Sequence, residues 1–177
     1  MFRIYRYILK SNLQIGGGTT LLNFINLSLK EKKMILEWRN STNIKKYMYT
    51  QDDISLENHM KFIESLKNSE DKIYFLVKKD DEFIGVIDFN NIKENESLIM
   101  GIYANPNLKG KGNILLETII NFSFYILKVK KIFAEVFFEN EKAYNLYKKY
   151  NFKEIGEKVV NDKKVICMEL DCKVKNL

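Results

Sequence analysis

The chain alternates between two patterns of hydrophobic positions after its first twenty residues. Segments 73–89 and 97–105 are rich in β-branched and aromatic residues, which favours strands, and Asp80-Asp81 marks a turn inside the first of them. Segments 28–40 and 141–150 carry apolar residues three and four positions apart, which predicts amphipathic helices. The whole pattern predicts elements in the order β-α-α-β-β-β-α-β-α-β-β.

Local signals place the other elements. Ser55 is predicted to cap a helix that runs through Lys67. The remaining predicted elements are a strand at 22–27, a helix at 113–127, a strand at 130–138 and two closing strands around an Asn161-Asp162 turn. A strand–helix–strand crossover among hairpins requires a mixed sheet. We therefore expect an α/β (α+β) fold, with a mixed, mostly antiparallel central sheet flanked by helices on both faces.

The length of 177 residues fits one domain with a substantial core. We expect that domain at residues 22–171, followed by a short tail at 172–177. Residues 1–21 are interpreted as an extension, either non-native or loosely held, rather than as a functional arm. The segment IGGGTT at its end has the composition of a flexible joint.

The net charge of +6 favours anionic partners, but the basic residues are scattered, with no run of five or more. We therefore expect no nucleic-acid partner. The two cysteines, Cys167 and Cys172, are too few for a disulfide framework or a zinc site, so no metal is expected. No apolar run has the length of a membrane span, and no signal peptide is evident, so we expect a cytoplasmic protein without a membrane partner.

The segment NPNLKGKGNILL joins a predicted strand to a predicted helix. A helix N-terminus offers free backbone N–H groups to phosphate oxygens, provided that the backbone can come close. Gly110 and Gly112 remove blocking side chains, while Lys109 and Lys111 add positive charge. An ordinary turn that needs positive φ is the alternative. The pattern lacks the Gly-Lys-Ser/Thr of a Walker loop and the third glycine of a dinucleotide fingerprint.

The helix at 141–150 follows Asn140 and carries Tyr147 on its apolar face. A tyrosine in this position is either a core residue or, if its phenol faces a cleft, a proton donor. The combination of NLKGKG with the pattern N-x-x-A-x-x-L-Y-x-K-x-N-F resembles the GNAT acyltransferase superfamily over residues 22–171. Asn107 stands where that family usually has Gln or Arg. Asn151 stands where it has Gly, and asparagine tolerates left-handed φ.

The resemblance implies acetyl-coenzyme A as cosubstrate and direct attack of an amine on its thioester. Tyr147 would protonate the departing thiolate. The implied cofactor-binding residues are Ile102 and Tyr103 for the pantetheine, Lys109, Gly110, Lys111, Gly112 and Asn113 for the pyrophosphate, and Asn140 for the cofactor arm. The amine needs a base, and Glu135 and Asp88 are candidates because each is predicted near the end of a strand.

The N-terminal half, with EWRN, KKYMYT and SLENHMKFI, is similar to one GNAT subgroup, the UDP-4-amino-sugar N-acetyltransferases of pseudaminic acid biosynthesis, which serve flagellin glycosylation. The resemblance implies a UDP-amino-sugar acceptor. Arg39 and His59 would bind phosphate, since arginine is a fork-shaped phosphate ligand. Met48, Tyr49 and Phe62 would pack around the uracil. The alternative for His59, Met48, Tyr49 and Phe62 is that each is an ordinary packed residue of the fold.

Two alternatives remain open at this point. Ribosomal-protein and other protein N-terminal acetyltransferases share the Trp-Arg-Asn element, although a peptide acceptor would not need an Arg-His phosphate pair. A non-catalytic acyl-CoA sensor or nucleic-acid-binding module is the alternative of another class, and the presence of Tyr147 with both carboxylates argues against it. A homodimer is one option for the assembly.

Overall fold

The computed structural model describes residues 7–172. Its strands and helices are β1 Leu13–Gln14, β2 Thr19–Asn23, α2 Leu29–Asn40, α3 Thr42–Lys45, α4 Leu56–Ser65, β3 Ile73–Lys79, β4 Glu82–Lys93, β5 Ser97–Ala104, α5 Gly112–Asn121, β6 Lys131–Phe137, α6 Glu141–Lys149, β7 Lys153–Val160 and β8 Lys163–Asp171. A π-helical turn, Phe122–Ile126, continues α5. No helix within this range is both long and apolar enough to cross a bilayer.

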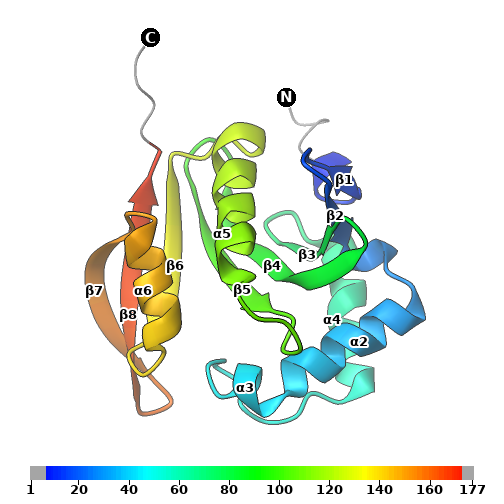
Figure 1. Ribbon diagram of the computed structural model, residues 1–177, viewed down its shortest axis with the longest axis horizontal. Helices are drawn as coiled ribbons and strands as arrows, with labels where there is room; N and C mark the ends of the chain where they lie inside the picture. The colour runs from blue at the N-terminus through cyan, green and yellow to red at the C-terminus, as the bar shows by residue number, and fades with distance from the viewer. Residues whose placement is uncertain (1–6, 173–177) are drawn as a thin grey trace.

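The described strands form one sheet in the order β1-β2-β3-β4-β5-β6-β8-β7 (Figure 1). Only β5 and β6 pair in parallel, and the other neighbouring pairs are antiparallel. The helix α5 makes the crossover between the two parallel strands, as expected for parallel neighbours. The prediction of a mixed, mostly antiparallel sheet is thus confirmed.

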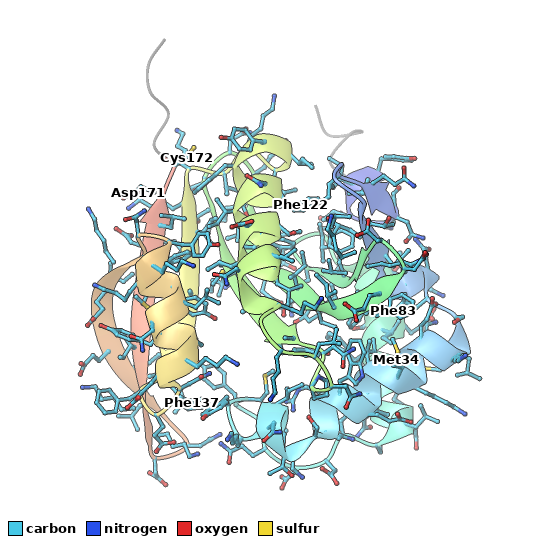
Figure 2. The ribbon with its side chains drawn as sticks, in the orientation of Figure 1. Met34, Phe83, Phe122, Phe137, Asp171 and Cys172 are labelled. Carbon is cyan, nitrogen blue, oxygen red and sulfur yellow. The ribbon has the colours of Figure 1, made fainter. Side chains whose placement is uncertain are left out.

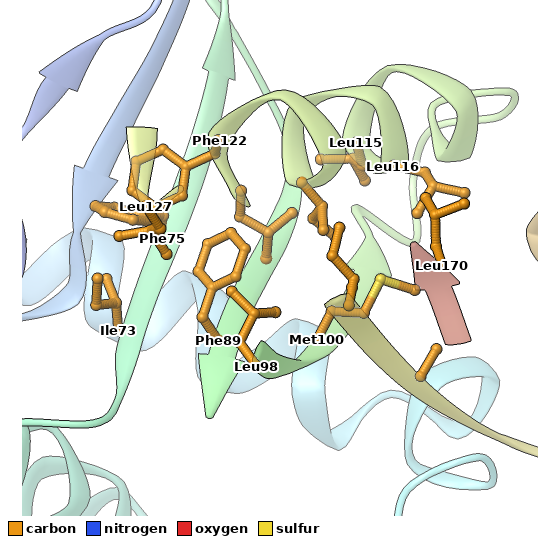
Figure 3. Packing of buried hydrophobic residues seen from close by; sticks show 14 of the residues in the cluster. Ile73, Phe75, Phe89, Leu98, Met100, Leu115, Leu116, Phe122, Leu127 and Leu170 are labelled. Carbon is orange, nitrogen blue, oxygen red and sulfur yellow. The ribbon is translucent and has the colours of Figure 1, made fainter. Parts of the chain in front are cut away.

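Two hydrophobic clusters lie on the two faces of the sheet. The larger one packs α5 and α6 against the sheet, and its centre is the aromatic group Phe75, Phe89 and Phe122, with ring centroids 5.0 to 6.4 Å apart (Figure 3). The smaller one packs α2 and α4 on the other face. Met34 of α2 and Phe83 of β4, both labelled in Figure 2, pack against this smaller cluster.

The chain before β2 is held against the domain. Leu9 is buried, and its carbonyl accepts a hydrogen bond of 2.8 Å from Asn23 Nδ2. The strand β1 then pairs with β2. Residues 7–21 therefore differ from the expected loose extension, while residues 1–6 lie outside the described range. The strand predicted at 22–27 lies earlier because Asn23 caps a 3₁₀ turn that begins at Phe24.

Side-chain caps mark the starts of two helices. Ser28 and Glu31 form a capping box at the start of α2. Ser55 Oγ accepts a hydrogen bond from the N–H of Asn58 at the start of α4, as predicted. These caps fix where α2 and α4 begin.

The end of α6 is a Schellman motif that orients Tyr147. The N–H of Phe152 donates to the Tyr147 carbonyl, the N–H of Asn151 donates to the Lys148 carbonyl, and Asn151 has a φ of 67°. The ring of Phe152 packs on that of Tyr147 at a centroid distance of 5.6 Å. The left-handed conformation confirms the expectation for asparagine in the family's glycine position.

Candidate active site

The two parallel strands separate after a short paired stretch. Their pairing runs from Ser97–Lys131 to Met100–Ala134 and then stops. Beyond this point β5 stays paired with β4, and β6 stays paired with β8. Backbone groups on the facing edges of the two strands are therefore available to a ligand, because buried polar groups need partners. Ile102 and Tyr103 lie on the β5 side of this split.

The glycine turn follows directly at the end of β5. Asn105 anchors it, since its side-chain amide donates to the Phe83 carbonyl at 2.9 Å and its Oδ1 accepts from the N–H of Asn107 at 3.0 Å. Gly110 has a φ of 73°, and a Cβ there would have no atom within 4 Å. The helix α5 then begins without a side-chain cap, so its first N–H groups remain available to an anion.

The polar residues around this turn differ in the ion pairs and hydrogen bonds that they form. Lys111 forms an ion pair with Glu82 at 2.7 Å. Lys109 is exposed and has no ion pair within residues 7–172. Asn113 Oδ1 accepts a hydrogen bond of 3.1 Å from Lys149, which ties the start of α5 to the end of α6. The expected pyrophosphate residues thus lie at one helix N-terminus.

Two further predicted residues, Asn140 and Gly112, lie where α6 packs against α5. Asn140 is the N-cap of α6, and its Oδ1 accepts a hydrogen bond from the N–H of Ala143. Gly112 leaves room for Leu146, whose Cδ2 would lie 3.1 Å from a Cβ at Gly112. The close packing of α5 and α6 therefore depends on a glycine at this point.

Tyr147 is buried, and its hydroxyl makes no hydrogen bond to any residue between 7 and 172. Burial raises the pKa of this phenol, and the negative charge of Asp88 raises it further. The hydroxyl therefore stays protonated and is not committed to a protein acceptor.

Asp88 lies beside the split, across from Gly101. The two residues are register partners in β4 and β5. A Cβ at Gly101 would lie 2.2 Å from Asp88 Oδ2 and 2.5 Å from Oδ1, so the carboxylate occupies the space that a side chain would fill. A side chain at Gly101, where β5 leaves β6, would therefore displace the Asp88 carboxylate.

The surroundings of Asp88 shift its ionisation into the neutral range. Burial raises the pKa of its carboxyl to about 7, and a hydrogen bond of 2.6 Å from Asn90 Nδ2 acts in the opposite direction. The side chain nevertheless keeps some accessible surface. A carboxylate with a pKa near the working pH, within reach of a ligand, has the properties of a general base.

Glu135 has a different environment on the β6 side of the split. Lys158 of β7 forms an ion pair with its Oε1 at 2.7 Å. The hydroxyl of Tyr49 donates a hydrogen bond to its Oε2. Tyr49 also packs edge-on against Phe137, which Figure 2 labels, at a centroid distance of 5.6 Å. Glu135 is thus engaged by two partners, whereas Asp88 has one.

Arg39 extends from α2 toward the same face of the sheet as Asp88. Its Nη2 donates to the Thr50 carbonyl at 2.9 Å, and its Nη1 is buried without a hydrogen-bond partner. Burial lowers the pKa of Arg39, while neighbouring Tyr103 raises it. An unpartnered guanidinium nitrogen is costly in a folded protein, which makes it a candidate for a ligand contact.

The other predicted acceptor residues separate into two groups. Met48 packs against the smaller cluster, and Phe62 packs edge-on against Tyr74 at a centroid distance of 5.0 Å. Both therefore lie on the face of the sheet that α2 and α4 cover, which we call the acceptor face. His59 is buried between α4 and α2, where its Nε2 lies 3.0 Å from the Lys32 carbonyl. The His59 ring is therefore engaged by the backbone of α2 in the free protein.

Three residues of the site were missed by the sequence analysis: Tyr74, Asn90 and Gly101. The strand pattern YFLV, with a tyrosine among aliphatic residues, and the close spacing of Asp88 and Asn90 on one strand face were the available signals. Neither signal gives the register that brings these residues together.

The sequence matches the acetyltransferase (GNAT) family over residues 33–152. The chain therefore belongs to the GNAT acetyltransferase family. It is an acetyl-CoA-dependent N-acetyltransferase. No group of three or more His, Cys, Asp or Glu side chains within residues 7–172 could hold a metal ion.

The chain is similar to acetyltransferases named PseH from Campylobacter jejuni. One from strain 81-176 is 42% identical over 154 residues, covering 86% of this chain and 96% of the relative. Another, from strain NCTC 11168, is 44% identical over 132 residues, covering 75% and 83%. The crystal structure of C. jejuni PseH with acetyl coenzyme A superposes with a TM-score of 0.72 at 37% identity, covering 86% of this chain and 98% of that one.

A more distant structure shares the fold alone. Spermidine N-acetyltransferase from Vibrio cholerae, solved with CoA and spermine, has a TM-score of 0.77 at 23% identity, covering 88% of this chain and 96% of that one. The GNAT fold predicted from the sequence is thus confirmed, as is acetyl-CoA as cosubstrate.

We predict that Gly101→Ala lowers kcat by roughly 10²-fold, because the new methyl group displaces the Asp88 carboxylate. Gly156→Ala is the matched control, since a Cβ there would meet no atom within 4 Å. Both variants are compared by acetyl-CoA turnover and by thermal unfolding. Equal turnover in the two variants would show that the position of the carboxylate does not matter.

Proposed function

We propose that the protein acetylates the 4-amino group of a UDP-4-amino-4,6-dideoxy sugar, UDP-4-amino-4,6-dideoxy-N-acetyl-β-L-altrosamine, in pseudaminic acid biosynthesis. The product would serve flagellin glycosylation, and the reaction would take place in the cytoplasm. The observation that carries the proposal is the 42–44% identity to PseH over most of both chains. The placement of Arg39, Met48 and Phe62 on the face of the sheet covered by α2 and α4 supports it.

The acceptor site is proposed to hold the UDP-amino sugar between α2, α4 and the sheet. The buried, unpartnered Nη1 of Arg39 supports a phosphate contact there. That atom is buried in the free protein, so a phosphate contact would require a rearrangement of the surrounding side chains. Met48, Phe62 and Tyr49 would contact the uracil. His59 would act through a shift away from the Lys32 carbonyl.

The cosubstrate is proposed to lie in the split between β5 and β6. Ile102 and Tyr103 would bind its pantetheine through backbone groups, and residues Lys109 to Asn113 would hold its pyrophosphate. The left-handed Gly110 and the uncapped start of α5 support this assignment. Asn140 would contact the cofactor arm from the start of α6.

The proposed chemistry uses two side chains for two proton transfers. Asp88 accepts a proton from the attacking amine, so that its nitrogen can form a bond to the thioester carbon. Tyr147 donates its phenolic proton to the sulfur as the carbon–sulfur bond breaks. Glu135, paired with Lys158, would contribute negative charge at the acceptor side rather than take the first proton. The products are the amide and the free thiol of coenzyme A.

An acceptor panel tests the proposed substrate. We expect free-thiol release with the UDP-4-amino sugar and none with an N-terminal peptide panel. Arg39→Lys is expected to raise KM for the sugar roughly tenfold or more and to leave KM for acetyl-CoA unchanged, because lysine lacks the bidentate fork. Turnover with peptides alone would instead favour a protein N-terminal acetyltransferase.

Tyr147→Phe is predicted to lower kcat by roughly 10²-fold with little change in KM for acetyl-CoA, because the ring remains and only the proton donor is lost. Tyr144→Phe, one turn earlier on the same helix, is the control for removing a hydroxyl. Its hydroxyl contacts Glu154 rather than the split. An unchanged kcat in Tyr147→Phe would exclude the phenol as the acid.

The pH profile of kcat, measured with both substrates saturating, tests the base. The wild-type rate is predicted to fall as the pH drops through about 7, because Asp88 becomes protonated there. Asp88→Asn should remove this acid limb and lower kcat roughly 10²- to 10³-fold. Glu135→Gln should retain the limb. The reverse result would assign the base to Glu135.

A further inference from the structure

Four residues form a line across three strands on the acceptor face of the sheet. Tyr74 of β3 pairs with Asp88 of β4, which pairs with Gly101 of β5. Asn90 lies two positions beyond Asp88 and so faces the same side. The Tyr74 hydroxyl lies 3.1 Å from Asn90 Oδ1, and Asn90 Nδ2 lies 2.6 Å from Asp88 Oδ1. The line ends where the carboxylate covers Gly101.

The chemistry of these groups fixes the direction of both hydrogen bonds. An ionised carboxylate can only accept, so Asn90 must present its NH₂ group to Asp88. The oxygen of the Asn90 amide then points to Tyr74, whose hydroxyl donates to it. Burial raises the pKa of Tyr74, and so the hydroxyl remains a donor. The rings of Phe24 and Phe62 hold that of Tyr74 at centroid distances of 5.6 and 5.0 Å.

We propose that Asn90 and Tyr74 are positioning residues for acetyl transfer. Tyr74 orients the Asn90 amide, and the amide holds Oδ1 of Asp88, which leaves Oδ2 over Gly101 to take the proton of the amine. This inference rests on the proposed role of Asp88 as the base. It adds two residues that touch neither substrate but determine the orientation and ionisation of the one that does.

The groups that face Asp88 explain why the amide matters. Tyr74 of β3, Tyr103 of β5 and Tyr147 of α6 all interact electrostatically with its carboxylate, and each remains a neutral phenol. Arg39 of α2 interacts with Tyr103 rather than providing a hydrogen bond to Asp88. The N–H of Asn90 is therefore the group that stabilises the charged form against burial.

Removal of this N–H should raise the pKa of Asp88. We expect Asn90→Ala to move the acid limb of the kcat profile up by roughly one pH unit, because a hydrogen bond to a charged group is lost. The rate then falls several-fold at pH 7 and recovers toward the wild-type rate at pH 9. Tyr74→Phe should shift the limb less, in the same direction, since the amide is retained but no longer oriented.

The controls are chosen to match each substitution. Asn91→Gly alters the neighbouring exposed asparagine, whose φ of 49° glycine also adopts. Tyr125→Phe removes a hydroxyl from an exposed tyrosine on the opposite face of the sheet. Neither control should move the limb. A loss of kcat in Asn90→Ala that is the same at every pH would overturn the positioning role.

A second readout is independent of turnover. The ¹³C resonance of the Asp88 carboxyl, assigned by its absence in Asp88→Asn, should titrate at a higher pH in Asn90→Ala than in the wild-type protein. An unchanged midpoint would overturn the inference. The kinetic profile is measured with whichever amine the acceptor panel identifies. If the UDP-sugar assignment is wrong, only the acceptor panel will show it. If the positioning role is wrong, the midpoints of the kinetic pH profile and of the ¹³C titration will show it.

Discussion

The early end of the β5–β6 pairing is the constraint on which the rest of the site depends. Two parallel strands that pair only as far as Met100 and Ala134 leave facing backbone edges without a partner. The outer edges of both strands remain bonded to β4 and β8, so the gap is held open by a continuous sheet. A ligand with amide groups of its own, such as pantetheine, can form hydrogen bonds with edges of this kind.

The split also brings together groups from the two faces of the sheet. Asp88 projects on the side covered by α2 and α4, whereas Tyr147 belongs to the cluster under α5 and α6. In a fully paired sheet the backbone would separate two such side chains. Here the charge of Asp88 acts on the phenol of Tyr147. The two groups proposed to transfer protons can therefore approach the split from opposite faces of the sheet.

The features that could be predicted from the sequence are those that depend only on neighbouring residues along the chain. The turn at Gly110, the cap at Ser55 and the left-handed Asn151 each follow from a local conformational need that a few residues express. The triplet Tyr74, Asp88 and Gly101 depends on the register of three strands, which no local pattern specifies. The packing of residues 7–21 likewise depends on a hydrogen bond between Leu9 and Asn23. The composition of the glycine segment between these two residues suggests flexibility and does not predict this contact.

The two candidate carboxylates differ in their surroundings. Glu135 has a lysine and a phenol as partners, so its charge is compensated. Asp88 is enclosed by neutral tyrosines and one amide, which raises its pKa to about 7 and makes it a much better proton acceptor than an ordinary aspartate. Burying the ionised Asp88 carboxylate costs free energy, and the same burial gives the carboxylate its raised proton affinity. A cation beside Asp88 would lower that cost, but it would also lower the proton affinity that the attacking amine requires. A neutral donor such as the Asn90 amide is the compromise, since it orients the carboxylate while leaving most of the effect of burial in place.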